Sequence, residues 1–365
     1  MSQLRTVQVL GGGSAGSSAH VGSLAAGLVA RGVQVTVCAP AGLDRTYEFS
    51  ATGARFAPVP RRTDPAAVAA LRVACAGADV VHAHGLHAAV RAAMALGGRR
   101  VPLVVTWHTR AHAEGARRRL LHLLERRAAR AAAVVLGTSS DLVDRARLRG
   151  ARDARLAPVA TPAPRVPATL SDGKVRAELG AVERPLIMAV GSLVPHHGFG
   201  TLLDAARAWR RLDPVPLVVI AGEGRERQAL QRRIKAEDLP VSLVGSRDDV
   251  TELLAAADLA VLPSRWESRS LVAQDALRIG VPLVATAVGG VPELVGDAAE
   301  LVPYANAEAL ARTVSRLLGD PVERDRLAAA GLVQAAGWPT EDDTIAQVLS
   351  VYDELAQPLA VAWNR

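Results

Sequence analysis

The sequence alternates short apolar runs with longer stretches in which apolar residues recur every three or four positions. Short apolar runs predict buried strands, and the three-to-four spacing predicts amphipathic helices. In the first half, this pattern predicts strands at 6–10, 33–38, 55–59, 79–84, 102–107 and 133–137, and helices at 19–30, 65–76, 87–95, 116–131 and 140–149. Such alternation predicts a parallel sheet with helices on both faces.

A proline-rich segment interrupts this alternation. Residues 155–170 contain Pro158, Pro162, Pro164 and Pro167, so we expect a linker there. The alternation then resumes, with strands expected at 186–190, 217–221, 242–244, 259–262 and 281–286, and helices at 199–211, 225–236, 250–256 and 270–279. The sequence therefore predicts two Rossmann-like α/β domains, 1–165 and 166–340, with a cleft between them, and a helical tail at 341–365.

Length and composition agree with this division. The chain has 365 residues, of which 50% are hydrophobic, enough for two domains with a core each. Cys38 and Cys75 both lie among apolar residues, so we expect buried free thiols in a reduced compartment. No apolar run is long enough to span a bilayer, and the N-terminus lacks the layout of a signal peptide. We therefore expect a soluble cytoplasmic protein.

The net charge of +7 favours phosphate-rich partners. Aromatic residues make up only 3% of the chain, which leaves few side chains on which bases could stack and argues against nucleic acid. The predicted helix 116–131 carries six arginines around a strip of leucines. Such a helix can lie on an anionic membrane, peripheral to its inner face, or it can be an ordinary solvated helix whose arginine stems cover the core.

Two acidic residues flank a predicted helix start after the strand 259–262. Glu267 lies in the loop 263–269, and Asp275 follows it by eight positions. The carboxyl ends of parallel strands are where ligands bind in open α/β sheets, and free backbone N–H groups at a helix start favour anions or sugar hydroxyls. We therefore include Ser268, Arg269, Ser270 and Leu271 among the candidate ligand-binding residues.

This stretch resembles glycosyltransferase family 4, whose members are retaining enzymes that use nucleotide sugars and have the GT-B fold. The matching elements are Pro263-Ser264, Glu267, Val284-Ala285-Thr286 and Gly289-Gly290-Val291-Pro292-Glu293, with Asp275 in place of the family's second glutamate. The resemblance implies that Glu267 contacts the donor sugar and Asp275 the ribose. It also implies that no metal or cofactor is needed, and that the helical tail crosses back to the first domain.

A glycine-rich loop follows the first predicted strand. Gly11, Gly13 and Gly16 have the spacing of a dinucleotide-binding loop, but the second strand ends in Cys38-Ala39-Pro40 without the acid that would bind a ribose. Binding of NAD or FAD is therefore an alternative with weak support. In family 4 the same loop precedes a His-Val pair, here His20-Val21, and the resemblance makes Gly12 and Gly13 candidate donor-binding residues.

Six of the nine histidines lie between His82 and His122, and three of them, His82, His84 and His108, follow or end predicted strands. Three convergent imidazoles suggest zinc, but a supporting carboxylate and close spacing are missing, so no metal site is predicted. The segments 80–85 and 104–109 resemble the family's Val-His-x-His and Thr-x-His elements. The resemblance implies that His108 faces the donor sugar as a catalytic residue, whereas the alternative is a capping or core histidine.

The sequence departs from the family where the donor's phosphates would lie. Family members carry Gly-Arg-Leu and then Lys-Gly, but this chain has Ser192 and His197 at the two cationic positions. His197, if protonated, would occupy the lysine's position, and Arg269 could supply a guanidinium from another direction or be a solvent-facing arginine. We therefore hold two hypotheses: a glycosyltransferase with an unidentified, lipid-linked or cell-envelope acceptor, and a catalytically degenerate relative that binds a sugar nucleotide or a partner. An epimerase on the same fold finds no support in any positioned pair of acids.

Overall fold

The structure is a computed structural model, and it describes residues 3–12, 15–60, 66–110, 115–161, 164 and 172–356. The chain folds into two compact units. The first unit comprises Met1–Thr161 and Pro339–Arg365, and the second comprises Pro162–Trp338. The sequence predicts the domain boundary at 165/166 and the start of the tail at 341. Each unit is described by itself below.

The first unit is built on a parallel sheet. Over the described residues its strands are β1 (Arg5–Leu10), β2 (Gln34–Ala39), β3 (Arg55–Pro58), β4 (Val80–His84), β5 (Leu103–Trp107), β6 (Val134–Gly137) and β7 (Ala154–Leu156). Their order in the sheet is β3-β2-β1-β4-β5-β6-β7, and all neighbouring strands are parallel. The strand order reverses between β1 and β4, which is where ligands bind in sheets of this kind.

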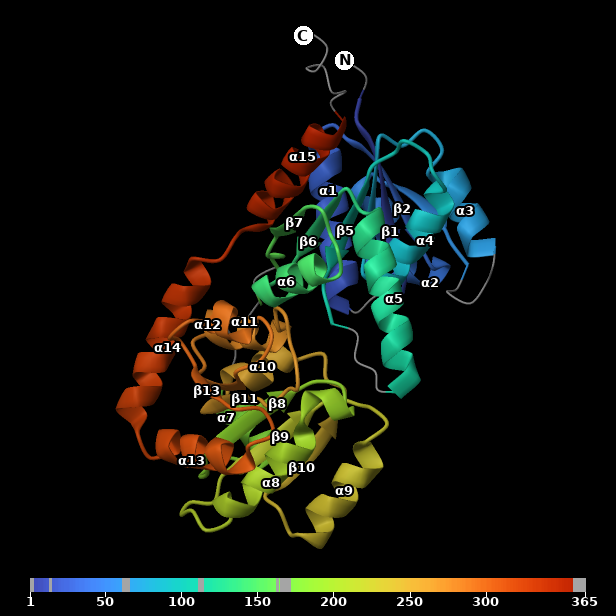
Figure 1. Cartoon of the computed structure of the whole chain (residues 1–365). Coiled ribbons are helices and arrows are strands. Elements are labelled where there is room, and N and C mark those ends of the chain that lie inside the picture. Colours follow the sequence, from blue (N-terminus) through green and yellow to red (C-terminus); the bar gives the residue numbers. More distant parts are fainter. Residues whose placement is uncertain are drawn as a thin grey trace. The chain divides into compact units, whose positions relative to one another are not determined.

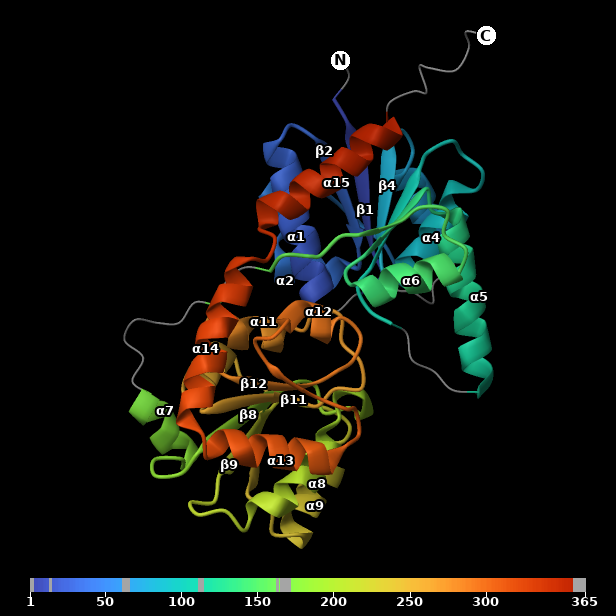
Figure 2. The same ribbon diagram turned by 60° about the vertical axis from the view of Figure 1, so that its left-hand side comes forward.

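Helices cover both faces of this sheet (Figures 1 and 2). Its described helices are α1 (Ala15–Ala30), α2 (Ala41–Tyr47), α3 (Ala66–Ala74), α4 (Leu86–Leu96), α5 (Gly115–Ala131), α6 (Ser140–Leu148) and α15 (Glu341–Ala356), with a 3₁₀ turn at Phe49–Thr52. Helices α1 and α15 share one hydrophobic cluster with the sheet, whereas α3, α4 and α5 lie on the opposite face.

The last described helix, α15, belongs to the first unit although its sequence follows the second. Arg31 of α1 pairs with Asp342 at 2.9 Å, and Arg155 of β7 pairs with Glu354 at 2.8 Å. Between these two ion pairs, Tyr352 is fully buried in the cluster with α1 and the sheet. The tail therefore contributes to the core of the first unit, because its apolar face is buried there.

The second unit has the same plan. Its described strands are β8 (Leu186–Val190), β9 (Leu217–Ala221), β10 (Val241–Gly245), β11 (Leu259–Leu262), β12 (Leu283–Thr286) and β13 (Glu300–Val302), in the parallel order β10-β9-β8-β11-β12-β13. Its described helices are α7 (Asp172–Leu179), α8 (Phe199–Trp209), α9 (Arg227–Ala236), α10 (Val250–Ala255), α11 (Leu271–Arg278), α12 (Val291–Val295), α13 (Ala307–Leu318) and α14 (Pro321–Ala336), with a 3₁₀ turn at Pro195–His197.

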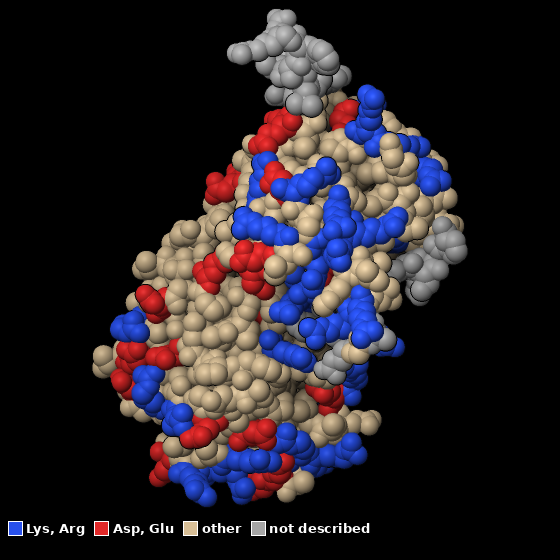
Figure 3. All heavy atoms as spheres, in the orientation of Figure 1, with Lys and Arg blue, Asp and Glu red and all other residues tan. Residues whose placement is uncertain are grey.

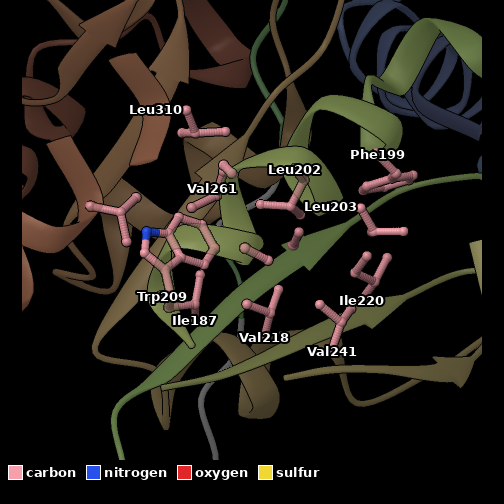
Figure 4. Close-up of a cluster of buried hydrophobic side chains, with 14 of the residues drawn as sticks. Ile187, Phe199, Leu202, Leu203, Trp209, Val218, Ile220, Val241, Val261 and Leu310 are labelled. Carbon is pink, nitrogen blue, oxygen red and sulfur yellow. The ribbon is translucent and has the colours of Figure 1, made fainter. Parts of the chain in front are cut away.

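Aliphatic residues supply most of the second unit's core, as the composition predicts. The cluster in Figure 4 contains the strand residue Ile220, Phe199 of α8 and the fully buried Trp209. The indole Nε1 of Trp209 donates to the carbonyl of Ala311 at 3.2 Å, so its one polar atom is satisfied inside the core. The strand order of this sheet reverses between β8 and β11, which locates its ligand-binding edge.

One expectation about the linker is wrong. Arg155 lies in strand β7, which pairs with β6 and extends the first sheet, rather than in a linker. The first proline of the segment is Pro158, so nothing prevents residues 154–156 from pairing with the neighbouring strand. The predicted end of the linker, Leu170, lies two residues before the start of α7 at Asp172. Among the described residues, no helix has the length and apolar character needed to cross a bilayer.

Candidate active site

The second unit presents Glu267 on the loop that follows β11, at the point where the strand order reverses. The Oε1 atom of Glu267 accepts a hydrogen bond of 2.9 Å from the hydroxyl of Ser264. Ser264 is fully buried, and its carbonyl accepts a hydrogen bond of 2.6 Å from the hydroxyl of Thr286 at the end of β12. The carboxylate is therefore held by a side chain that is itself fixed to the neighbouring strand.

Two glycines allow other backbone segments to approach this loop. Gly198 has a φ of 72°, and a Cβ atom there would lie 2.0 Å from the carbonyl oxygen of Pro263. Gly289 has a φ of 54°, and a Cβ atom there would lie 2.0 Å from the carbonyl oxygen of Glu267. Any other residue at either position would both strain the backbone and displace the loop. The glycines of the family motif thus help to position Glu267.

His197 lies next to Glu267, in the position where family members carry lysine. Its Nδ1 atom is 3.5 Å from Oε1 of Glu267 and 3.4 Å from the hydroxyl of Ser264. Ser192, in the position of the family's arginine, is exposed. The structure therefore brings the predicted residues His197 and Glu267 together.

Helix α11 begins directly after this loop, with Ser270 as its N-cap. The Ser270 hydroxyl accepts a hydrogen bond from the backbone N–H of Ala273 at 3.5 Å. Ser268 and Ser270 are buried, whereas Leu271 is 41% exposed. Asp275 lies one turn further along the helix, and burial raises the pKa of its carboxyl from 3.8 to about 6, partly offset by Arg278. An acid whose charge is destabilised in this way gains from a ligand that donates hydrogen bonds to it.

Arg269 is not the solvent-facing arginine that one interpretation expected. Its Nε and Nη2 atoms are buried and have no hydrogen-bond partner among the described residues. Its guanidinium lies 5.7 Å from the centre of the Trp338 ring, and burial lowers its pKa, with Glu293 raising it and Arg278 lowering it further. The groups around Arg269 thus come from α11 (Arg278), from α12 (Glu293) and from the residues that follow α14 (Trp338). The role of Arg269 as a replacement cation stays a prediction.

Histidines from three elements converge in the first unit. His84 ends β4, His108 follows β5, and His20 lies in α1. The Nδ1 atom of His84 lies 3.3 Å from Nε2 of His108, and the His20 ring centre lies 5.6 Å and 5.4 Å from those of His84 and His108. The sequence pattern groups His82 with His84 and His108, whereas in the structure His20 is the third histidine of the cluster.

His82 instead belongs to a buried network behind this cluster. Its Nδ1 atom lies 2.7 Å from the Tyr352 hydroxyl, and its Nε2 atom lies 2.6 Å from the hydroxyl of Thr106. Gln8 joins the network to His84: its Nε2 donates to the Tyr352 hydroxyl at 2.9 Å, and its Oε1 lies 3.0 Å from Nε2 of His84. His82 is therefore a core histidine with both ring nitrogens satisfied.

Burial keeps these imidazoles neutral. It lowers the pKa of His20 to about 4 and, together with His20, that of His108 to about 3. The pKa values of His82 and His84 are also well below their ordinary value, because of burial and then the neighbouring histidines. A neutral imidazole can donate and accept hydrogen bonds, but it cannot neutralise a phosphate.

Gln8 and Tyr352 are two residues of this network that are absent from the sequence-based candidates. The signal for Gln8 was a single amide inside the otherwise apolar end of the first strand, a position that demands a buried partner. Nothing local to Tyr352 could have predicted its contact with a strand more than three hundred residues earlier. Of the two loop glycines predicted to bind donor, Gly12 is exposed with a φ of 87°, and Gly13 lies outside the described residues.

Helix α5 presents a basic and apolar surface. Leu120 and Leu123 are 57% and 62% exposed, and exposed arginines surround them at positions 117, 118, 119, 126, 127 and 130. Figure 3 shows lysine and arginine side chains gathered over this helix and its surroundings. The helix is fixed to α6 by Glu125, which is 4% exposed and pairs with Arg145 at 2.7 Å and with Arg149 at 2.8 Å.

Comparison with known proteins agrees with this architecture. Residues 15–162 match the glycosyl transferase 4-like domain, and residues 172–333 match glycosyl transferases group 1. The crystal structure of Anabaena Alr3699/HepE in complex with UDP has a TM-score of 0.81 and 19% identity, covering 97% of this chain and 100% of that chain. WaaG, a glycosyltransferase involved in lipopolysaccharide biosynthesis, has a TM-score of 0.69 and 18% identity, covering 96% and 99%. At these identities the likeness shows the fold.

Curated relatives are similar over shorter stretches. The D-inositol 3-phosphate glycosyltransferase of Salinispora arenicola is 35% identical over 195 residues, which are 49% of this chain and 43% of that protein. The GDP-mannose-dependent alpha-(1-6)-phosphatidylinositol monomannoside mannosyltransferase of Mycolicibacterium smegmatis is 31% identical over 202 residues, 50% and 52% of the two proteins. The chain thus spans about half the length of these relatives.

The two sheet-based units and their carboxylate-bearing loop define the GT-B class of sugar-transferring enzymes. Together with the two matched families, they show that the chain belongs to the GT-B glycosyltransferases of the family 4 type.

Proposed function

We propose that the protein transfers a hexose-type sugar from a nucleotide-diphosphate donor to an acceptor, with retention of configuration at the anomeric carbon. The observation that carries this proposal is the fixed carboxylate of Glu267, held by Ser264 where the strand order of the second sheet reverses. A carboxylate at that place can accept hydrogen bonds from the hydroxyls of the donor sugar. Relatives that transfer sugars, and a structural neighbour described with UDP, support a nucleotide sugar as the donor.

The other donor contacts follow from the same resemblance. Asp275 would accept hydrogen bonds from the ribose, and the N-terminal turn of α11, with Ser268, Ser270 and Leu271, would supply backbone N–H groups to the sugar or phosphates. His108 would face the donor sugar and acceptor, where its neutral imidazole can exchange hydrogen bonds with sugar hydroxyls. Gly12 and Gly13 would allow the backbone of the first unit to approach the diphosphate.

His197 is the residue through which this chain would neutralise the departing diphosphate. A protonated imidazole at the lysine position would bring one positive charge beside Glu267. Removing one well-placed stabilising group from a transition state costs about 3 to 4 kcal/mol. With Ser192 in place of the arginine, we expect a slower enzyme than one that carries both cations.

The acceptor lies at a lipid surface in this proposal. The exposed leucines of α5 and the arginines around them form the kind of helix that inserts its apolar side into an interface and attracts anionic headgroups. Such a surface would place the first unit beside a lipid-linked or cell-envelope acceptor.

A catalytically degenerate binding protein is the second candidate. The observation that favours it is the pair of substitutions at Ser192 and His197, which removes both permanent cations from the phosphate region. Such a protein would bind a sugar nucleotide through Glu267 and Asp275 without breaking the sugar–phosphate bond.

A two-stage experiment separates these candidates. The melting temperature of the purified chain is measured with UDP, GDP, ADP and their glucose and mannose derivatives. Each stabilising nucleotide sugar is then incubated with the protein, and free nucleotide diphosphate is measured over time. Stabilisation with release above the uncatalysed rate supports the transferase. Stabilisation without release supports the binding protein, and no stabilisation by any of these compounds would contradict both.

A further inference from the structure

Trp338 is the last residue of the second unit and lies just after the end of α14. Its ring packs against an apolar cluster to which α11 and α12 both contribute. The indole Nε1 donates to the carbonyl of Leu294 in α12 at 3.1 Å, and Nε2 of Gln334 donates to the same carbonyl at 3.1 Å. Packing and a hydrogen bond therefore fix the ring against α12.

Two guanidinium groups lie over this ring. The Cζ atom of Arg269 is 5.7 Å from the ring centre, and that of Arg278 is 5.4 Å from it. Both distances are within the roughly 6 Å over which the face of an indole attracts a cation. Arg269 belongs to the loop that carries Glu267, and Arg278 is the last residue of α11. The ring thus joins the loop to both helices.

Burial leaves the Arg269 guanidinium in need of such a partner. Its Nε and Nη2 atoms are buried and have no hydrogen-bond partner among the described residues. Buried N–H groups without an acceptor are costly, and the π electrons of an indole attract a guanidinium without a hydrogen bond. The charge of Glu293 acts in the same direction, whereas that of Arg278 opposes it. The ring is therefore part of what keeps Arg269, and with it the loop, in place.

A second link reaches the loop through α12. The backbone N–H of Gly290, the N-cap of this helix, donates to the carbonyl of Glu267 at 2.9 Å. Near the other end of the helix, the carbonyl of Leu294 accepts from Trp338. Trp338 therefore acts on the loop twice, at Arg269 through its ring and at Glu267 through α12. The two links hold the main chain at Glu267 and shortly after it.

We propose that Trp338 is a positioning residue for the carboxylate of Glu267. It acts through Arg269 and α12, which fix the main chain of the loop, and it is not a catalytic residue. The consequence for the rate rests on the proposed sugar transfer, in which a shift of about an ångström in a positioned group can lower the rate about a hundredfold. The holding of the loop does not rest on it, since all these contacts lie within the second unit.

Two substitutions separate the ring face from the rest of Trp338. Trp338→Leu keeps an apolar side chain but removes the aromatic face. Trp338→Phe keeps an aromatic face and loses the indole N–H, while Gln334 still donates to the Leu294 carbonyl. The matched control is Val333→Ser, which changes a residue of α14 that is 76% exposed. Melting curves show that each variant is folded before it is compared.

Hydrogen exchange of the full chain, measured by mass spectrometry, tests whether the ring holds the loop. The informative peptides cover residues 264–270 and 288–292, and the second contains the Gly290 amide that is bound to Glu267. We expect Trp338→Leu to speed exchange in both peptides about tenfold or more, whereas Trp338→Phe and Val333→Ser should stay within about twofold of the unchanged chain. A peptide that covers β9 should exchange equally in every protein.

Donor cleavage tests the consequence for the rate, with UDP-glucose and GDP-mannose as the probes. We expect kcat of Trp338→Leu to fall about tenfold or more and KM to change less than about threefold, because the other donor contacts stay in place. Trp338→Phe should recover most of the rate. A purely structural role would lower the melting temperature and leave kcat per folded molecule unchanged.

Loop exchange decides the proposal first. It is overturned if a folded Trp338→Leu variant exchanges like the unchanged chain, or if Trp338→Leu and Trp338→Phe speed exchange equally. Faster exchange with an unchanged kcat would overturn the positioning role. If the unchanged chain cleaves neither probe, the proposed transfer fails for these donors, and the exchange measurements alone decide whether Trp338 holds the loop.

Discussion

The Nδ1 atom of His197 lies 3.5 Å from Oε1 of Glu267. At this distance, a charge on the imidazole in the lysine position acts directly on the carboxylate that is proposed to contact the sugar. A protonated His197 would both pair with Glu267 and leave its other ring nitrogen to donate to a phosphate oxygen. In this way a site without the family's two cations could still hold a diphosphate.

The substitution His197→Lys should speed donor cleavage. A permanent ammonium at this position stabilises the leaving diphosphate more than an imidazole does, by a fraction of the about 3 to 4 kcal/mol typical of such a group. We expect the rate of nucleotide release from the donor to rise about tenfold at pH 8. The control is His196→Lys, which adds the same charge at an exposed neighbouring position. Equal rates in both variants and the unchanged chain would contradict this account of His197.

Asp275 should make the stability of the chain depend on pH. Its folded-state pKa of about 6 lies above its ordinary 3.8, so the folded chain binds more protons than the unfolded chain between these values. This carboxyl therefore lowers the free energy of unfolding as the pH rises through that window. We compare the free energy of unfolding of Asp275→Asn with that of the unchanged chain. After discounting for the partial exposure of the carboxyl, we expect this difference to shift by about 1 kcal/mol in favour of the variant between pH 4 and pH 7.5.

Urea unfolding at several pH values measures this difference. The control is Asp325→Asn, at an exposed carboxylate of α14. Its free energy of unfolding should differ from that of the unchanged chain by the same amount at every pH. A constant difference for Asp275→Asn as well would show that the carboxyl is not destabilised by burial.

The Tyr352 hydroxyl should stabilise the first unit. Tyr352→Phe leaves Nε2 of Gln8 and Nδ1 of His82 buried without that partner, and unsatisfied buried groups cost about 1 to 3 kcal/mol. We expect the free energy of unfolding of this unit to fall by about 2 kcal/mol in chemical denaturation. The matched control is Tyr304→Phe, because Tyr304 is 41% exposed and should tolerate the change. Equal losses in the two variants would show that the buried network contributes nothing specific.

Helix α5 should bind anionic vesicles. The double variant Leu120→Ser/Leu123→Ser removes the exposed apolar residues but keeps every arginine, so we expect about tenfold weaker binding to vesicles that contain phosphatidylglycerol. The control is Val322→Ser/Val333→Ser, which removes two similarly exposed apolar residues from α14. Sedimentation with vesicles measures both. If the unchanged chain fails to sediment with them, the membrane part of the proposal is wrong.

The sequence predicted the fold better than it predicted the site. Two parallel sheets follow from short apolar runs separated by helical spacing, and burial of both sheet faces makes that pattern strong. Strand β7 was missed because Ala154 and Arg155 are only partly buried and Leu156 is exposed, so edge pairing rather than hydrophobicity defines it. Glu267 and His197 could each be named from their motifs, and the strands β11 and β8 that precede them are neighbours, which brings the two side chains together. The convergence of His20 with His84 and His108 could not be predicted, since the rotation of α1 on the sheet is set by packing that no local pattern encodes.

The measurement that tests the central claim most directly is nucleotide release with Glu267→Gln. The amide keeps the size of the side chain and can still accept from Ser264, so the loop should remain folded and the nucleotide should still raise the melting temperature. We expect the rate of donor cleavage to fall about a hundredfold or more, because the fixed charge beside the sugar is lost. Cleavage at an unchanged rate in a folded, nucleotide-binding Glu267→Gln variant would contradict the account.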